Sequence, residues 1–434
     1  MPTYKTNYTY RNWARTQEFK PARLSEPQTE SEVVEVVQDA LAKGHHIRPH
    51  GGGHSWSDLI VTDSTLIQLD RLKAGQADLP NRRYTVQAGI RLKDLIRKLA
   101  EQGLALRNLG SITEQSIAGA ISTGTHGTGL RLQNMSQSII SMKLVTGTGE
   151  LLSIQETDTD LLDAARVSLG ALGIITEVTI DCVPLYDLEY TAFFGQFDDV
   201  IGQIETLNEE NERFLIWWLI PPFGSRENVI VITMNPTGAP RGSSEEWPIS
   251  GEDGIHEPLP MDTNDLFGRL VSRTFSPRAL QQVIRYTDRY DKVLTLPLLP
   301  VFHREFEYAI PVEKTSEALL RLKHVIDEGD ISTTLPIEVR FVAKDNSLLS
   351  PARGRDVCYI GVSTQPNANE VYARVEPIMK DLEGRPHWGK HFSLRRSEVE
   401  AMYPDSYDIF RQLRQELDPQ GVFGNTLVRE LFDF

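Results

Sequence analysis

Three consecutive glycines followed directly by a histidine are the residues with the clearest potential for chemistry. Gly51, Gly52 and Gly53 precede His54. Because glycine lacks a Cβ, backbone N–H groups in such a turn can approach the oxygens of an anionic ligand without steric cost. A flexible turn with no ligand is the simpler interpretation of the glycines alone. His54 favours the ligand-binding interpretation, since an imidazole here would contact whatever the turn holds.

Other interpretations of this segment fit less well. It lacks the Gly-Lys-Ser/Thr ending of a P-loop, and residues 56–58 do not begin the apolar helix that follows a dinucleotide-binding turn. His46, His50 and His54 are spaced four residues apart, which would align them for zinc on a helix. Pro49 and the glycines make a helix unfavourable, so we expect no metal, with a zinc hydrolase as the alternative.

A second segment, residues 117–129, is dense in small residues along its whole length. Close packing of a helix or strand would also favour Gly, Ala, Ser and Thr. Packing does not require the alternation of hydroxyls, glycines and a histidine that runs from Thr123 to Gly129. Hydroxyl and amide donors without cationic side chains suit a pyrophosphate held by neutral hydrogen bonds. A third glycine-bearing turn, residues 170–173, leads into an expected strand.

Glu338 and Arg340 alternate with apolar neighbours between residues 337 and 341. The alternation predicts a strand with both charges on one face. A solvated ion pair and a grip on a polyhydroxylated substrate explain this pattern equally well. Residues 385–390 form a compact, aromatic and basic segment, which alone favours a loop around one packed tryptophan.

The spacing of apolar residues predicts the elements that position these side chains. A helix is expected through residues 33–41, with Ser31 as its N-cap and Gly44 as its end, and further helices at 91–102, 161–167 and 312–326. Strands are expected at 63–70, 83–88, 139–145, 151–154, 174–180, 214–220, 302–310 and 337–341, the third and fourth as a hairpin. The pattern changes near Val183, where we place a domain boundary. Residues 235–265 are rich in Pro, Gly, Ser and acidic residues, which predicts an exposed segment.

The composition excludes several classes of protein. A chain of 434 residues can bury a large core and is expected to form two domains. Its net charge of −15 argues against a nucleic-acid partner, which requires clusters of Lys and Arg. The start of the chain carries no secretion pattern, and the most apolar run, 294–302, is too short to span a membrane. Cys182 and Cys358 predict neither a disulfide framework nor a zinc site, and we expect a cytoplasmic protein.

Taken together, these segments resemble the vanillyl-alcohol oxidase type of FAD-binding flavoprotein, and within it the aldonolactone oxidases, with alditol oxidases as near relatives. The resemblance runs from about residue 20 to the C-terminus, while residues 221–298 match poorly. It rests on motifs in the expected order: GGGHS at 51–55, NLGS at 108–111, THGTG at 125–129, LGALG at 169–173, PIEVR at 336–340, LLSP at 348–351 and PHWGK at 386–390.

The resemblance implies an α+β fold of two domains. Residues 1–182 would form the FAD-binding domain. Residues 183–395 would form a substrate domain built on an antiparallel sheet flanked by helices. Residues 396–434 would pack back against the FAD-binding domain.

The resemblance also implies roles for individual residues. His54 matches the histidine that is bonded covalently to the flavin 8α-methyl carbon. Glu338, Arg340, Lys390 and Ser111 match positions that line the substrate pocket. Gly110 matches a position against the flavin ring, where relatives that act as dehydrogenases carry alanine. The implied FAD contacts are Gly51, Gly52, Gly53, His54, Ser55, Gly110, Ser111, Gly119, Thr123, Thr125, His126, Gly127, Gly129, Gly170, Gly173 and Ile174.

The implied reaction is oxidation of a sugar 1,4-lactone at the hydroxyl next to the carbonyl. A hydride passes to flavin, and dioxygen reoxidises the flavin to give hydrogen peroxide and an ascorbate-type product. The alternatives are an alditol oxidase acting on a linear polyol, a lactone dehydrogenase with another electron acceptor, and a binding protein without turnover. The expected partners are a lactone or polyol and dioxygen, with no nucleic acid and no membrane span.

Overall fold

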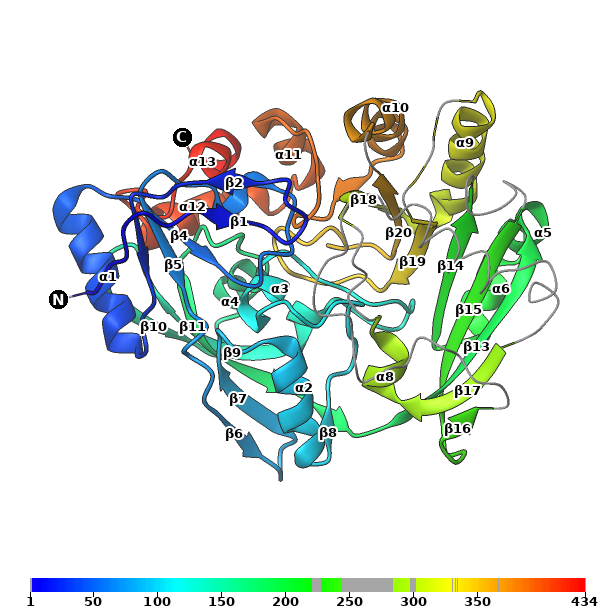
Figure 1. The fold of residues 1–434 in the computed structure, drawn as a ribbon, viewed down its shortest axis with the longest axis horizontal. Helices are drawn as coiled ribbons and strands as arrows, with labels where there is room; N and C mark the ends of the chain where they lie inside the picture. The colour runs from blue at the N-terminus through cyan, green and yellow to red at the C-terminus, as the bar shows by residue number, and fades with distance from the viewer. Residues whose placement is uncertain are drawn as a thin grey trace.

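The computed structural model describes residues 2–220, 228–243, 284–296, 302–329, 331, 333, 335–364 and 367–433. In Figure 1 the first part of the chain (blue to cyan) lies beside the following part (green to yellow), and the red C-terminal helices return to the first part. The described strands form two large antiparallel sheets and three small ones. This arrangement places the first and second halves of the chain on either side of the site described below.

A small parallel sheet leads to the glycine turn. It consists of β3 (Arg23–Ser25), β5 (Thr65–Gln68) and β4 (Ile47–His50), in that order, and α1 (Glu30–Lys43) connects β3 to β4. The N-cap of α1 is Thr29, whose side chain accepts a hydrogen bond from the Glu32 backbone, so our prediction of Ser31 was wrong. Both hydroxyl residues fit an N-cap, but Ser31 is already helical. The helix ends as predicted at Gly44, which has a φ of 64°.

A five-stranded antiparallel sheet supports the first half of the chain. Its order is β10, β9, β11, β7 and β6, and the predicted hairpin is confirmed, with Leu151 opposite Val145. Its apolar side chains form one core with those of the neighbouring helices. The strands are β6 (Gly75–Asp78), β7 (Arg83–Gln87), β9 (Ile139–Val145), β10 (Leu151–Ile154) and β11 (Ile174–Asp181), and the helices are α2 (Leu92–Glu101), α3 (Ile117–Ser122) and α4 (Thr159–Arg166).

A nine-stranded antiparallel sheet dominates the second half. Its order is β16 (Gly242–Ser243), β17 (Ile284–Arg289), β13 (Asp187–Gln196), β15 (Asn228–Thr237), β14 (Arg213–Leu219), β19 (Ile337–Val342), β20 (Val357–Thr364), β18 (Arg304–Pro311) and β21 (Arg385–Pro386). The accompanying helices are α5 (Phe197–Ile201), α6 (Ile204–Glu210), α8 (Tyr290–Leu294), α9 (Thr315–Asp327) and α10 (Ala368–Asp381). The expected antiparallel sheet flanked by helices, and with it the α+β class, is confirmed.

The two faces of this sheet differ in chemistry because strand side chains alternate. Ile337, Val339 and Phe341 of β19 join the core formed with α9 and α10. Glu338 and Arg340 therefore lie on the opposite face. The same alternation on β18 buries Phe306 in that core, so its acidic neighbours share the face of Glu338.

The C-terminal helices contact the first half of the chain. They are α11 (Arg396–Met402), α12 (Tyr407–Leu417) and α13 (Thr426–Phe432). Arg414 donates to the Ala171 carbonyl at 2.7 Å, and the Ile47 N–H donates to the Val422 carbonyl at 2.8 Å. Both bonds fix the tail beside the 170–173 turn and β4. The domain boundaries themselves stay a prediction.

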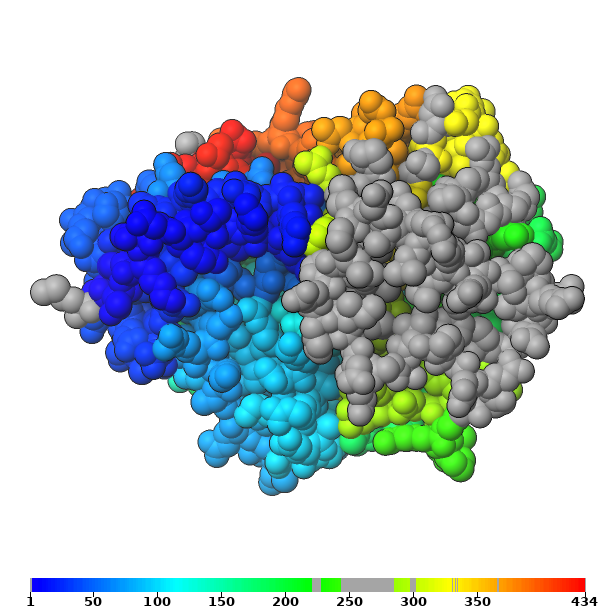
Figure 2. Space-filling model, viewed as in Figure 1, coloured from blue at the N-terminus to red at the C-terminus, as the bar shows by residue number. Residues whose placement is uncertain are grey.

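The remaining described elements are short. They are β1 (Tyr10–Arg11), β2 (Glu18–Phe19), β8 (Leu104–Ala105), β12 (Val183–Pro184) and the 3₁₀ helices η1 (Asp58–Ile60), η2 (Met135–Ser138) and η4 (Val312–Lys314). In the space-filling view the N-terminal residues (dark blue) cover the upper left of the molecule (Figure 2). β15 continues to Thr237, and the described residues 235–242 at the start of the predicted exposed segment are exposed or half-buried. Residues 244–265, and 297–301 of the apolar run, lie outside the described residues.

Two negative expectations can be compared with the structure. Cys182 and Cys358 are both free and buried, in agreement with the absence of a disulfide framework. In the part of the chain that the structure describes, every helix is too short or too polar to cross a membrane.

Candidate active site

A cavity of about 890 Å³ lies between the two halves of the chain. The glycine turn after β4, the segment from Gly110 to His126 and the 169–173 turn contribute to its lining. The face of the nine-stranded sheet that carries Glu338 and Arg340 also lines it. Segments that are far apart in the sequence therefore meet around one space.

Most of the residues singled out from the sequence line this cavity. They are Gly51, Gly52, Gly53, His54, Ser55, Gly110, Ser111, Gly119, Thr123, Thr125, His126, Gly170, Gly173, Glu338, Arg340 and Lys390. Three others do not line it. Gly127 packs so closely against Asn108 that an added Cβ would lie 2.1 Å from Asn108 Oδ1. The Gly129 N–H donates to the Phe341 carbonyl at 2.6 Å. Ile174 is fully buried in a core. These three residues support the cavity walls.

The glycine turn has the close packing that an anion-binding turn requires. A Cβ on Gly51 would lie 2.2 Å from Ser116 Oγ, and one on Gly52 would lie 2.4 Å from the Glu114 carbonyl. Gly53 has a φ of 72°, which strains any residue with a side chain. The N–H groups of Gly52, Gly53 and His54 donate no hydrogen bond to another described residue. They are available to the oxygens of a ligand such as the FAD pyrophosphate.

Two histidines flank this turn. His50 donates through Nδ1 to the Gly51 carbonyl at 3.1 Å, and its Nε2 is buried without a hydrogen-bond partner. His54 stacks on Trp13, with ring centroids 5.5 Å apart. Burial lowers the pKa of each of these histidines to about 4. Both imidazoles are therefore neutral at physiological pH, and a neutral ring nitrogen is the form that can bond to a carbon electrophile.

The histidine ladder of the alternative zinc interpretation does not form. His50 belongs to strand β4, and His46 contacts Arg429 Nη2 at 2.7 Å without lining the cavity. The extended backbone forced by Pro49 separates side chains that a helix would have aligned.

Arg340 links the strand face to the segment from Gly110 to His126. Its guanidinium donates to Ser111 Oγ at 2.5 Å and to Glu338 Oε1 at 2.7 Å, and Trp217 also donates to Glu338, at 3.1 Å. Arg340 is only 8% exposed, and its Nε has no partner. Burial disfavours the charged form, but Glu338, Glu307 and Glu305 outweigh burial and raise the pKa of Arg340. The Arg340 guanidinium therefore stays charged, and its Nε–H is available to donate a hydrogen bond to a ligand.

A second charged pair on β18 was missed in the sequence. Glu305 forms an ion pair with Lys390, whose Nζ also lies 4.0 Å from Glu307 Oε2. Burial opposes ionisation of Glu305, but Lys390 and His303 outweigh it and lower its pKa to about 2. In the sheet, Gly361 of β20 lies opposite Glu307 of β18 on one side and opposite Glu338 of β19 on the other. Because glycine has no side chain, the two carboxylates face the same part of the cavity. The structure places the Lys390 ammonium against the carboxylates of Glu305 and Glu307.

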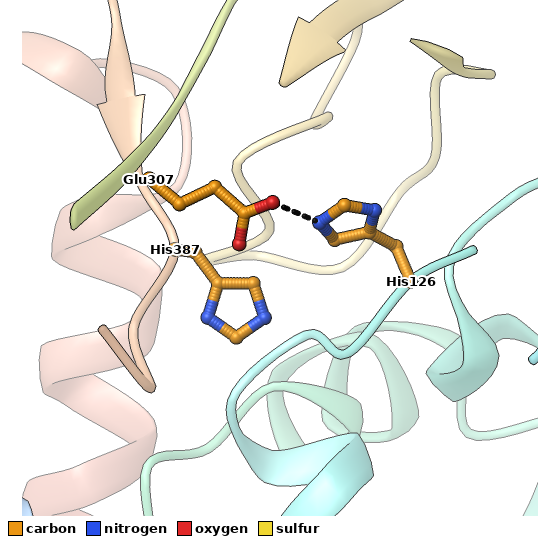
Figure 3. Close-up of side chains that lie close together, drawn as sticks. All are labelled: His126, Glu307 and His387. Atoms are coloured by element: carbon orange, nitrogen blue, oxygen red, sulfur yellow. Dashed lines mark ion pairs between the residues drawn. The ribbon is translucent and has the colours of Figure 1, made fainter. Parts of the chain in front are cut away.

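His126, Glu307 and His387 form a buried cluster (Figure 3). Among the described residues, this is the group whose ligand atoms lie close enough to hold a metal ion, within 4.8 Å of one another. Its hydrogen bonds indicate another role. His126 Nδ1 donates to the Gly127 carbonyl at 2.9 Å and Nε2 lies 3.3 Å from Glu307, while His387 Nδ1 accepts from the Gly389 N–H.

These contacts fix where the protons are. Burial lowers the pKa of His387 to about 3, so this ring is neutral and carries its proton on Nε2, which blocks ligation there. Both nitrogens of His126 face oxygen acceptors, so a proton lies between His126 and Glu307. Burial opposes ionisation of Glu307, but His126 and Lys390 outweigh it and lower the pKa of this carboxyl. We therefore infer that His126 and Glu307 share a proton and that the cluster is not a metal site.

Comparison with known proteins agrees with this geometry. Residues 21–155 match the FAD binding domain family, and residues 178–431 match the family described as D-arabinono-1,4-lactone oxidase. An L-gulono-1,4-lactone dehydrogenase from Mycobacterium tuberculosis is 36% identical over 97% of this chain and 98% of its own. An L-gulonolactone oxidase from Scyliorhinus torazame is 33% identical over 98% of each chain. A crystal structure of cholesterol oxidase from B. sterolicum, 17% identical, matches with a TM-score of 0.84 over 99% of this chain and 97% of that one.

The family matches and the named lactone oxidase and dehydrogenase relatives identify an FAD-dependent oxidoreductase, and its fold is of the vanillyl-alcohol oxidase type. More specifically, the chain belongs to the D-arabinono-1,4-lactone oxidase family, which matches more than half of it. The family expected from the motifs is confirmed.

Proposed function

We propose that this enzyme oxidises a sugar 1,4-lactone at the hydroxyl next to the carbonyl, with FAD bound covalently to His54 and dioxygen as electron acceptor. The observation that carries the proposal is the arrangement of Arg340, Glu338 and Ser111. Glu338 and Arg340 lie on the cavity wall formed by the nine-stranded sheet, and Arg340 reaches Ser111 in the first half of the chain. The glycine turn and His54 form another wall of the same cavity. Bound FAD would supply the hydride acceptor.

The protein's own residues would bind and polarise the substrate. Arg340 has a free Nε donor, which can stabilise negative charge that develops on the substrate oxygen. Glu338 can accept hydrogen bonds from substrate hydroxyls. The carboxylates Glu305 and Glu307, next to Lys390, have lowered pKa values and stay ionised, so they can accept hydrogen bonds from substrate hydroxyls.

The charge balance favours a neutral substrate over an acid. Arg340 contacts Glu338, and Lys390 contacts Glu305, so each cation at this face already has a carboxylate partner. An open-chain aldonate is an anion and would meet no uncompensated positive charge at this face. A lactone is uncharged and needs no such partner.

The names of the relatives support lactone chemistry but imply different electron acceptors. The Scyliorhinus torazame relative is named an oxidase and the Mycobacterium tuberculosis relative a dehydrogenase. We infer an oxidase because Gly110 stands where the dehydrogenase relatives are expected to carry alanine. A lactone dehydrogenase with another acceptor is the second candidate, and it is favoured by the name of the 36% identical relative.

A substrate panel with peroxide detection tests this proposal. Purified flavin-loaded protein is supplied in air with L-gulono-, L-galactono- and D-arabinono-1,4-lactone, with the hydrolysed aldonates as matched controls and with linear alditols. The proposal expects peroxide from at least one lactone and little from its aldonate. Peroxide from alditols alone would identify an alditol oxidase. Turnover only with an added quinone or cytochrome would identify a dehydrogenase.

A further inference from the structure

Trp56 connects the flavin-binding turn to the lysine of the substrate face. It lies two residues after His54, and its backbone N–H donates to the Gly389 carbonyl at 2.8 Å. The face of its ring lies under the Lys390 ammonium, with Nζ 4.7 Å from the ring centroid. An ammonium over an indole face is an attractive contact, and it is stronger where water is excluded. Trp56 thus restrains Lys390 by both its backbone and its side chain.

Trp56 also holds the partner of Lys390. Its indole Nε1 donates to the His303 carbonyl at 2.6 Å, and its ring lies 5.4 Å from the His303 ring. His303 stands two residues before Glu305, which forms the ion pair with Lys390. The Trp56 side chain therefore contacts Lys390 and also fixes the start of β18, the strand that carries Glu305.

The serines on either side of Trp56 bind the same loop. Ser55 Oγ donates to the Gly389 carbonyl at 3.0 Å, and Ser57 Oγ donates to the Trp388 carbonyl at 2.7 Å. Trp388 is fully buried and donates in turn to the Leu349 carbonyl at 2.6 Å. The segment that carries His54 and the loop that carries Lys390 consequently behave as one unit.

We propose that Trp56 is a positioning residue that sets the place of the Lys390–Glu305 pair relative to the flavin-binding turn. This inference rests on the proposed function for the role of Lys390 in turnover. Lysine has a flexible stem with high rotamer entropy, so the carboxylates of Glu305 and Glu307 alone confine Lys390 poorly. The indole face and the His303 bond supply the missing restraint. Loosening Trp56 should free Lys390 without removing it.

Chemical labelling measures this restraint without relying on activity. Flavin-loaded wild type, Trp56→Leu and Trp56→Phe are treated briefly with an amine-acylating reagent, and modification of Lys390 is read by mass spectrometry. Lys93, which pairs with Glu114 in the same cavity, is the internal reference. Trp56→Leu should raise Lys390 labelling relative to Lys93 by about 2- to 30-fold, the range of cation–π contacts. Trp56→Phe keeps an aromatic face and should restore most of the protection.

Steady-state kinetics with the most active lactone completes the test. Trp56→Leu should lower kcat by about tenfold or more at unchanged flavin content, with Trp56→Phe intermediate. An unchanged labelling ratio in Trp56→Leu would overturn the proposal, as would a loss of kcat that only follows a loss of flavin. If wild type oxidises no lactone, the proposed function fails, and the labelling ratio still decides the role of Trp56.

Discussion

Replacing Arg340 by methionine is the most informative single change at the substrate face. Methionine keeps much of the volume of the side chain and removes its charge and all its donors. The change deletes the bonds to Ser111 Oγ and to Glu338 Oε1, and it leaves Glu338 with the Trp217 indole as partner. The residues of the glycine turn are untouched.

The expected effects differ for catalysis and stability. Loss of one preorganised donor to a developing oxyanion typically costs about 100- to 1000-fold in kcat, or about 2.7–4 kcal/mol. Breaking a fully buried ion pair costs about 3–5 kcal/mol of folding free energy. The Glu338 side chain is 23% exposed and keeps a hydrogen bond, so we expect a smaller loss of about 2 kcal/mol here.

The assay compares kcat/KM per bound flavin, the flavin absorption spectrum and the unfolding temperature. Arg213→Met is the matched control, because Arg213 is also buried, donates to the Arg107 carbonyl at 2.9 Å and does not line the cavity. It should lose stability and keep kcat/KM within about threefold of wild type. The double variant Glu338→Gln/Arg340→Met should be no slower than Arg340→Met, since the two residues act as one unit.

The reasoning fails if Arg340→Met retains kcat/KM within about fivefold of wild type with its flavin bound. Arg340 would then be a structural partner of Glu338, as in an ordinary solvated ion pair. A loss of activity shared equally by Arg213→Met would assign the effect to folding.

Two further predictions concern the cofactor. Apoprotein mixed with FAD should attach flavin to His54 at nearly equal rates at pH 5.5 and 7.5, because burial lowers the pKa of His54 to about 4 and the neutral imidazole is the nucleophile. An attachment rate roughly tenfold lower at pH 5.5, as expected for an ordinary imidazole, would contradict this. In His54→Ala, all of the flavin should be extractable by acid. Gly110→Ala should slow reoxidation by dioxygen more than reduction by lactone in stopped-flow traces. An added Cβ would lie 2.9 Å from Thr125 Cγ2, so equal slowing of both half-reactions would indicate a packing role.

Local pattern predicted much of the fold. Apolar periodicity located α1, α2 and the β9–β10 hairpin because each buries one regular face. The N-cap of α1 was misplaced because Thr29 and Ser31 both have capping side chains, and the choice depends on the approach of the preceding chain. The order of the nine-stranded sheet depends on contacts between distant strands, which no local pattern encodes.

The candidate site was only half visible in the sequence. Glu338 and Arg340 alternate on β19, and Glu305 and Glu307 alternate in the same way on β18, where no recognisable motif marks them as site residues. Nothing local shows that β20 places Gly361 opposite both Glu307 and Glu338. Trp56 followed the glycine turn in the sequence, and its contact with Lys390 arises only when distant segments meet.

Anaerobic mixing of the flavin-loaded enzyme with lactones tests the central claim most directly. Without oxygen the measurement isolates the transfer of reducing equivalents from substrate to flavin, whatever the later acceptor. The account predicts that at least one of the three 1,4-lactones abolishes the visible flavin absorbance band, that its open-chain aldonate leaves the band intact, and that Arg340→Met bleaches about 100-fold more slowly. A band that survives every lactone and disappears with a linear alditol would contradict the account.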